Sequence, residues 1–168
     1  MEEKEDLLFA YYTGGSGNVN PISRIPEEQA QISKDATVYA KRFSDNVIAA
    51  MAGLQSHEPG IIRSAKAPLG DRGFELHAYT LGSIGFATVP VEIFDITAKH
   101  IRDGSNCDMT FVLTCANGRD RYIPIDETRD YVSSNGQVPY ETRICFYPRG
   151  TAEQLAQQLI TMFTDLRK

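Results

Sequence analysis

The sequence predicts an α/β fold in which helices flank a mixed β-sheet, organised as a single domain over residues 1–168. Three observations support this prediction. Short apolar runs with strand character alternate with two long segments that have the apolar spacing of amphipathic helices. The alternation has no strict strand–helix–strand rhythm, which favours a mixed sheet over a purely parallel one. The chain is long enough to bury one core, and it shows no internal repeat or low-complexity tract.

The first half of the chain opens with an apolar run. Residues 7–13 predict a buried strand that leads into a glycine-rich stretch. From Asp35 to Leu54, apolar residues recur at steps of three and four, which predicts a helix with a buried apolar stripe and Asp35 as its N-cap. The stripe consists of Val38, Tyr39, Phe43, Val47, Met51 and Leu54. Strands are then predicted at 61–67, 74–81 and 84–89, with Gly82-Ser83 as the hairpin turn between the last two.

The second half alternates in the same way. Pro90 and the residues after it predict a helix that runs to about Ile101. Thr151 and Gln154 form a capping box for a last helix that ends near Leu166. Its apolar face consists of Leu155, Leu159, Met162, Phe163 and Leu166. Between the two helices the sequence predicts a strand at 108–116, a short extended segment at 122–124, a polar loop to 136 and a strand at 141–147.

The composition excludes several classes of protein. The net charge is −5 and no Lys/Arg cluster occurs, so the sequence predicts no nucleic-acid binding. The apolar runs are far shorter than the ~20 residues that a membrane-spanning helix needs. The charged N-terminus is unlike a secretory signal. The three cysteines, an odd number without C-x-x-C spacing, are expected to be reduced and unpaired, which favours a cytoplasmic location.

Three stretches could carry a site, and each also has a structural explanation. The first, Gly14-Gly15-Ser16-Gly17-Asn18-Val19-Asn20-Pro21, has the composition of an anion or oxyanion loop made of Gly14, Gly15, Gly17 and Asn18, or of a tight structural turn. No Lys-Ser/Thr follows, so it is not a P-loop. In the second, Glu92 follows Pro90 and would favour the first turn of a helix. The third stretch runs from Asn117 to Pro124 and is followed by Pro139-Tyr140-Glu141. Tyrosines near strand ends, such as those in this stretch, are often packing residues. The three histidines have no metal-binding spacing.

The order of these motifs resembles one family. G-x-x-G-[DN]-x-[NS]-P, then V-P-x-E-x-F, then N-G-x-x-x-Y-x-P, and finally Y-E are similar to the neutral/alkaline, non-lysosomal ceramidases and their bacterial ceramidase-like relatives. The resemblance runs from Phe9 to the final helix and matches only the C-terminal part of that family's catalytic domain. Members are zinc-dependent amidases that hydrolyse the N-acyl bond of ceramide.

The resemblance implies roles for particular residues. Glu92 and Tyr122 stand at the family's glutamate and tyrosine metal ligands, and Tyr140 belongs to a tyrosine–glutamate pair near the catalytic site. Asn18 stands at the position of the family's aspartate and Asn20 at that of its catalytic serine. The sequence departs from the family pattern in three ways. It has an asparagine in place of this serine and Val91 in place of a glycine. It also has no match to the upstream part of the domain, which carries two histidine ligands.

These observations lead to three hypotheses. In the first, the chain is the C-terminal portion of a zinc-dependent N-acyl amide hydrolase domain, inactive alone, with zinc bound only if a complementary N-terminal half-domain chain supplies the histidines. In the second, it is a non-catalytic binding or assembly module that forms a homo-oligomer through an apolar surface. In the third, the resemblance is accidental, and Ser16 or Asn20 lines a small phosphate or carboxylate pocket. The first predicts that Glu92, Tyr122 and the Gly14–Asn20 loop converge on one cleft.

Overall fold

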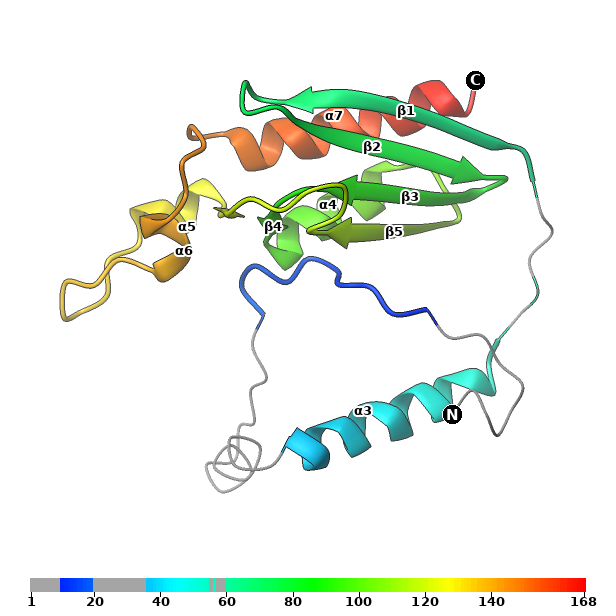
Figure 1. The fold of residues 1–168 in the computed structure, drawn as a ribbon, viewed down its shortest axis with the longest axis horizontal. Helices are drawn as coiled ribbons and strands as arrows, with labels where there is room; N and C mark the ends of the chain where they lie inside the picture. The colour runs from blue at the N-terminus through cyan, green and yellow to red at the C-terminus, as the bar shows by residue number, and fades with distance from the viewer. Residues whose placement is uncertain (1–9, 20–35, 55, 57–59) are drawn as a thin grey trace. The chain divides into compact units, whose positions relative to one another are not determined.

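The computed structural model describes residues 10–19, 36–54, 56 and 60–168 (Figure 1). The chain divides into two compact units. One consists of Met1–Val19 together with Pro59–Lys168, and the other is Asn20–Glu58. Each unit is described by itself. No helix among the described residues combines the length and hydropathy needed to cross a bilayer.

A mixed four-stranded sheet forms the centre of the larger unit, as predicted. Its strands lie in the order β1-β2-β3-β5. The β1–β2 and β2–β3 pairs are antiparallel, and the β3–β5 pair is parallel. A glycine with φ +58° at Gly82 makes the tight turn between β2 and β3, where a side chain would be strained. The strand bounds are β1 Ile62–Leu69, β2 Phe74–Leu81, β3 Ile84–Val89 and β5 Met109–Thr114.

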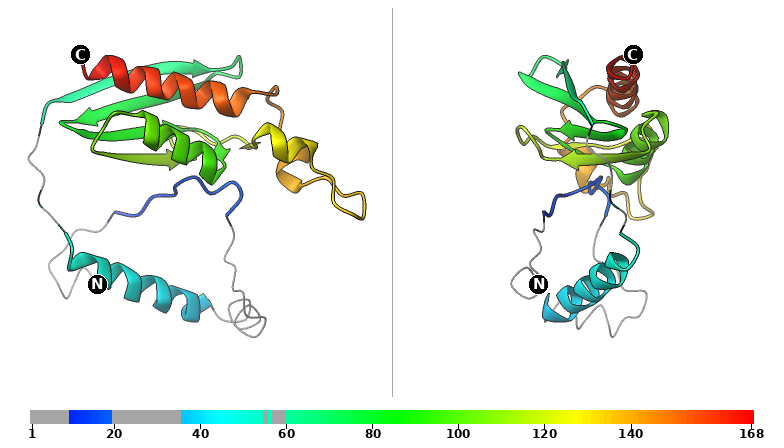
Figure 2. Two further views of the ribbon diagram at one scale, coloured as in Figure 1. Left: turned by 180° about the vertical axis from the view of Figure 1, so that it is seen from behind. Right: turned by 90° about the vertical axis from the view of Figure 1, so that its right-hand side faces the viewer.

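Two helices cover the same face of this sheet (Figures 1 and 2). Helix α4, Asp95–Gly104, forms the crossover that the parallel β3–β5 pair requires. Helix α7, Thr151–Leu166, buries its predicted apolar face against β1, β2 and α4. The ring of Phe163 lies against Gly85 of β3, where a Cβ atom would come within 3.0 Å of it. This contact places a fully buried aromatic ring in the centre of the core.

A second, two-stranded sheet replaces the predicted start of the second helix. Strand β4, Glu92–Ile93, pairs in parallel with β6, Tyr122–Ile123. The prediction that residues 91–94 begin a helix was therefore wrong. Val91 and Ile93 are buried, and Glu92 between them is half-buried. This alternation with a period of two residues is typical of a strand. The backbone at this point bonds to distant segments, since the Glu92 amide donates to the Arg121 carbonyl and the Val91 carbonyl accepts from the Cys115 amide.

The segment between β6 and α7 also differs from the prediction. The polar loop contains the short helix α5, Asp126–Asp130. The predicted strand at 141–147 begins instead as helix α6, Tyr140–Arg143. None of the described strands pairs with this segment, and Pro139 fits the position before a helix, where a missing amide costs nothing.

The predicted capping box at the start of α7 was wrong as well. Gly150, with φ +75°, precedes the helix, and the Thr151 hydroxyl donates to the Pro148 carbonyl. The Gly150 amide donates to the Asp126 carboxylate.

The predicted strand at 7–13 falls partly on residues 1–9, outside the described residues. Residues 10–13 form no strand, and Tyr11 and Tyr12 are exposed. This segment lies beside the end of β5, where the Thr114 amide donates a hydrogen bond to the Thr13 carbonyl. All three cysteines are free, as predicted.

In the smaller unit, the predicted helix is α3, Ala36–Met51. Its apolar stripe is not buried as predicted, since Tyr39 is 44% and Phe43 46% exposed. A stripe is buried only where another surface covers it, and α3 is the only element described within this unit.

Candidate functional site

Glu92 and Tyr122 lie directly opposite each other in the β4–β6 pair. The parallel register fixes their Cα atoms as partners. Both side chains are half-buried, while the neighbouring Ile93 and Ile123 are fully buried beneath them. Two residues thirty positions apart in the chain thus present a carboxylate and a phenol at one point of the surface.

The surroundings of Tyr122 raise the pKa of its hydroxyl to about 12, from an ordinary value of 10.0. Partial burial is the largest cause, followed by the hydrogen bond to Glu92 and the negative charge of this carboxylate. Glu92 and burial likewise raise the pKa of the Cys115 thiol, burial being the larger cause. The site therefore favours neutral Tyr122 and Cys115 beside Glu92.

The raised Tyr122 pKa predicts a loss of stability in alkaline solution. The folded state resists the ionisation that the unfolded chain undergoes near pH 10, so this contribution is complete below pH 10 and declines as the pH rises towards 12. Unfolding by urea across this range should show a steeper decline for the natural protein than for Tyr122→Phe. Equal slopes for the two proteins would contradict the assignment.

Tyr140 extends the pair on one side. Its ring lies edge-on to the ring of Tyr122, with 5.9 Å between centroids, and is itself 54% exposed. The guanidinium of Arg143 lies 5.9 Å from the Tyr140 ring centroid. An exposed phenol in this position could contact a molecule bound at Glu92 and Tyr122.

The glycine-rich loop lies against β4 and the start of α4. The Gly17 amide donates to the Ile93 carbonyl at 2.9 Å. A Cβ atom at Gly17 would lie 3.0 Å from the Glu92 and Ile93 carbonyl oxygens, and one at Gly15 would lie 2.6 Å from the Ala98 Cβ. Close backbone packing therefore requires glycine at both positions. The Gly17 amide is engaged by Ile93, whereas Asn20 lies outside the described residues.

Asn18 binds the start of helix α4 from a distant part of the chain. Its side-chain oxygen accepts a hydrogen bond from the Asp95 amide at 2.9 Å, and its side-chain nitrogen donates to the Asp95 carboxylate at 2.7 Å. Phe94, the residue at the N-cap, offers no such bond. Asn18 thus supplies the missing cap, and it connects the glycine-rich loop to the helix that follows Glu92.

Removal of this cap should weaken the protein measurably. Asn18→Ala is expected to lower the free energy of unfolding by about 1 kcal/mol, because the Asp95 amide loses its partner. Chemical denaturation measures the change. Val19→Ala, at an exposed neighbouring position, serves as the control and should have little effect. Equal effects of the two substitutions would contradict the capping role.

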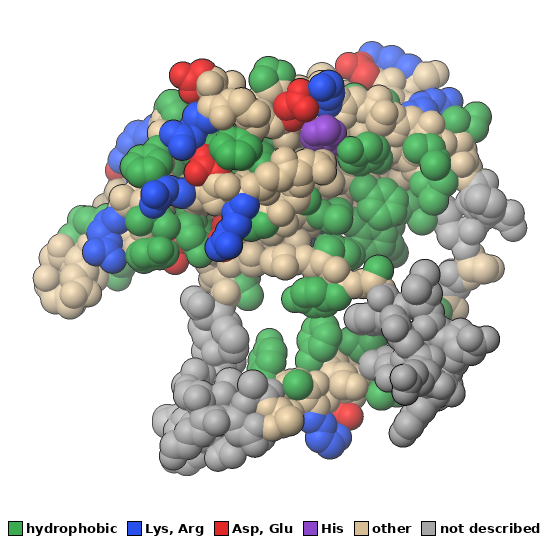
Figure 3. Space-filling view, in the orientation of Figure 1, with side chains coloured by type: hydrophobic (Ala, Val, Ile, Leu, Met, Phe, Trp, Pro, Cys, Tyr) green, Lys and Arg blue, Asp and Glu red, His purple; other side chains and the backbone are tan. Residues whose placement is uncertain are grey.

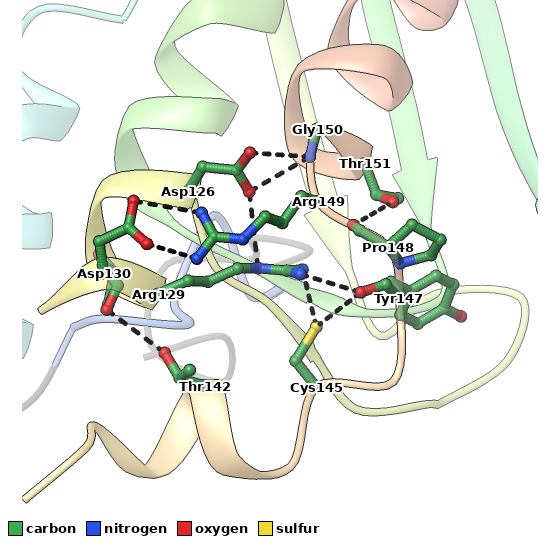
Figure 4. A network of polar contacts seen from close by, with 11 residues as sticks. Asp126, Arg129, Asp130, Thr142, Cys145, Tyr147, Pro148, Arg149, Gly150 and Thr151 are labelled. Atoms are coloured by element: carbon green, nitrogen blue, oxygen red, sulfur yellow. Dashed lines mark hydrogen bonds and ion pairs between the residues drawn. The ribbon is translucent and has the colours of Figure 1, made fainter.

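Arg129 fixes the segment that carries Tyr140 (Figure 4). Its guanidinium donates to the Tyr147 carbonyl at 2.9 Å and to the Cys145 sulfur at 2.9 Å, and it lies 3.7 Å from the Asp126 carboxylate. The Thr142 hydroxyl of α6 donates to the Thr128 carbonyl of α5. These bonds join α5 to α6 and to the segment before α7 without a regular sheet.

Glu92 and Tyr122 present two oxygen-bearing side chains at this site. Catalytic zinc normally takes three protein ligands. Among the described residues, no group of three His, Cys, Asp or Glu side chains could hold a metal. Glu92, Tyr122 and Tyr140 place a carboxylate, a neutral phenol and an exposed tyrosine ring next to one another on one surface.

Comparison with known proteins gives a distant structural similarity. No family model matches the sequence, and no curated protein matches it. Among solved structures, the chain is similar to a ceramidase complexed with C2, with a TM-score of 0.47 and 17% identity over 55% of this chain. It is also similar to the neutral ceramidase from Pseudomonas aeruginosa, with a TM-score of 0.45 and 15% identity over 55% of this chain. The chain spans 15% of the length of each. A similarity at this level carries no inference about activity.

The structure brings together most of the residues that the sequence singled out. Glu92 lies in β4 and Tyr122 in β6, and the Tyr140 ring contacts that of Tyr122. In the loop, Gly15, Gly17 and Asn18 contact β4 or the start of α4, whereas Gly14 contacts β5. Their roles as metal ligands, catalytic residue and anion loop stay predictions. Sequence reasoning missed Asp95, whose only signal was a carboxylate at the start of a helix.

Proposed function

We propose that this chain is a ceramidase-like portion of an N-acyl amide hydrolase domain and that it is inactive alone. The observation that carries the proposal is the parallel β4–β6 pair, which sets Glu92 directly opposite Tyr122. These are the two residues that the motif order assigns to the metal. A helix-capping glutamate and a packing tyrosine would have no reason to be partners.

The proposed division of roles follows from the chemistry of the donors. The Glu92 carboxylate and the Tyr122 phenol would supply two oxygen ligands, and two histidines from another part of the hydrolase domain would complete a zinc set. Tyr140 would contact the acyl amide from the exposed side of the site. Asn20 has no hydroxyl to act as a nucleophile, which further favours inactivity.

Two experiments test this proposal. First, the isolated chain should not hydrolyse N-acylsphingosine, with or without added zinc. Turnover by the isolated chain that Glu92→Ala abolishes would contradict the proposed inactivity.

Second, the histidine-bearing half of a neutral ceramidase is fused before Met1, and the zinc affinity of this fusion is measured by competition with a chelator. Glu92→Ala and Tyr122→Phe should each weaken zinc binding at least tenfold, about 1.4 kcal/mol. Glu127→Ala, at an exposed carboxylate of α5, is the matched control and should leave the affinity unchanged. Equal affinities in all four proteins would rule out both ligands.

An assembly role is the second candidate, because apolar side chains gather on the face of the sheet opposite α4 and α7. Hydrophobic side chains gather over the ends of β2, β3 and β5 in the view of Figure 3. Phe86 and Phe111 stack at 5.2 Å, and Tyr12 meets Phe111 edge-on at 5.6 Å. Ile62 and Met109 are 73% and 55% exposed.

Such a surface favours association with another protein surface. Sedimentation analysis should show a dimer or larger species that Met109→Lys converts to a monomer. A monomer at all concentrations would contradict self-association.

A further inference from the structure

A pocket lies in the larger unit, and neither Glu92 nor Tyr122 lines it. It has a volume of about 450 Å³ and lies between the β1–β2 turn, the segment before α7 and the first two turns of α7. Three deeply buried residues contribute to its walls: Leu69, Tyr147 and Leu155, which are 3%, 5% and 1% exposed. Phe146, 58% exposed, adds an aromatic wall at the opening. The volume and the apolar lining suit a small organic molecule.

One guanidinium in this pocket is held in place. The Arg72 Nε donates to the Asp120 carboxylate at 2.9 Å, and its guanidinium carbon lies 5.8 Å from the Tyr147 ring centroid and 5.6 Å from that of Phe146. The Tyr147 hydroxyl donates to the same carboxylate at 2.9 Å. Asp120 thereby orients both groups, and the burial of Tyr147, followed by its hydrogen bond to Asp120 and the negative charge of that carboxylate, raises the pKa of Tyr147. Arg72 itself remains 42% exposed.

The guanidinium keeps hydrogen-bonding capacity for a ligand. Arginine has five N–H donors, of which Nε is bound to Asp120, so donors on its terminal nitrogens can reach a carboxylate. A second guanidinium, that of Arg121, lies 4.6 Å from the Phe146 ring centroid and adds positive charge beside the opening. Asp71 also lines the pocket, and its negative charge disfavours a doubly charged group such as phosphate.

We propose that this pocket binds a small monocarboxylate with an apolar chain. The chain would lie against Leu69, Leu155 and Phe146, and the carboxylate would bind N–H groups on the terminal nitrogens of Arg72. Gln154 and Gln158 of α7 line the same pocket and offer amides for a further hydrogen bond. This proposal is independent of the proposed hydrolase function, because none of these residues belongs to the β4–β6 site.

The test compares four ligands that share one apolar chain. Hexanoate, hexylammonium, hexan-1-ol and hexyl phosphate are titrated into the full chain, and binding is followed by NMR chemical-shift changes. Hexanoate should bind most tightly, with saturable shifts of resonances from residues 69–72 and 146–158. No saturable binding of hexanoate, or tighter binding of any other member of the series, would overturn the proposal.

Matched substitutions separate recognition from general damage to the fold. Arg72→Gln should weaken hexanoate binding at least tenfold and hexan-1-ol binding little, whereas Arg63→Gln, at an exposed arginine of β1, should change neither. Phe146→Ala should weaken both ligands, and Tyr131→Ala, at a ring exposed to a similar 59%, should weaken neither. Glu92→Gln should leave hexanoate binding unchanged, which distinguishes this pocket from the proposed hydrolase site. Equal hexanoate binding by Arg72→Gln and the natural protein would rule out the assigned role of Arg72.

Discussion

Phe163→Ala is expected to lower the free energy of unfolding by about 3–5 kcal/mol, the range for deletion of a fully buried aromatic ring. Phe163 is 0% exposed, and its ring lies against Gly85 of β3. The cavity would be lined in part by the rigid backbone of β3, which cannot collapse to fill it. Equilibrium unfolding in urea measures the change.

Gln157→Ala provides the control on the same helix, at an exposed position where alanine is favourable in a helix. It should change the free energy of unfolding by no more than about 0.5 kcal/mol. A loss below about 1 kcal/mol for Phe163→Ala would mean that α7 does not fill the core as described.

Arg129→Met should produce the second large effect, a loss of about 2–4 kcal/mol in the free energy of unfolding. The side chain of Arg129 is 11% exposed, and its removal would leave the Tyr147 carbonyl and the Asp126 carboxylate without this partner (Figure 4). Methionine keeps the length of the side chain but not its donors. Hydrogen exchange should also accelerate across α6 and Cys145, because Arg129 holds this segment to α5.

Arg149→Met is the matched control for this prediction. Arg149 also pairs with an aspartate, but its side chain and that of Asp130 are 56% and 66% exposed. Exposed ion pairs contribute little to stability because water screens them, so this substitution should have a small effect. Equal losses for the two substitutions would contradict the role assigned to Arg129.

Much of the fold could be predicted from local patterns. The β2, β3 and β5 segments alternate buried and half-buried side chains, and α7 repeats its apolar residues on one face, so each carries its own signal. The β4 strand could not be predicted in this way. Two residues after a proline look like a helix start, and only bonds to distant residues such as Arg121 make them a strand.

The candidate site was predictable only in part. Order and spacing of short motifs connected Glu92 with Tyr122, although neither has a local signal for a metal site. Asn18 was assigned to an anion loop, whereas its side chain binds the start of α4. The Arg72–Asp120 ion pair could not be predicted from the sequence. Its two residues are forty-eight positions apart, and surface arginines and turn aspartates occur in most proteins.

The β4–β6 pair has a consequence for the motions of the protein. Two strands of two residues each close a loop of thirty residues, and few backbone hydrogen bonds offset the entropy lost on closure. The four-stranded sheet, by contrast, is stabilised by long ladders and by α7. Local opening of the small sheet therefore requires less free energy than global unfolding. Such an opening would separate the carboxylate from the phenol and would expose Ile93 and Ile123, so the pairing of Glu92 with Tyr122 depends on the core packing beneath it.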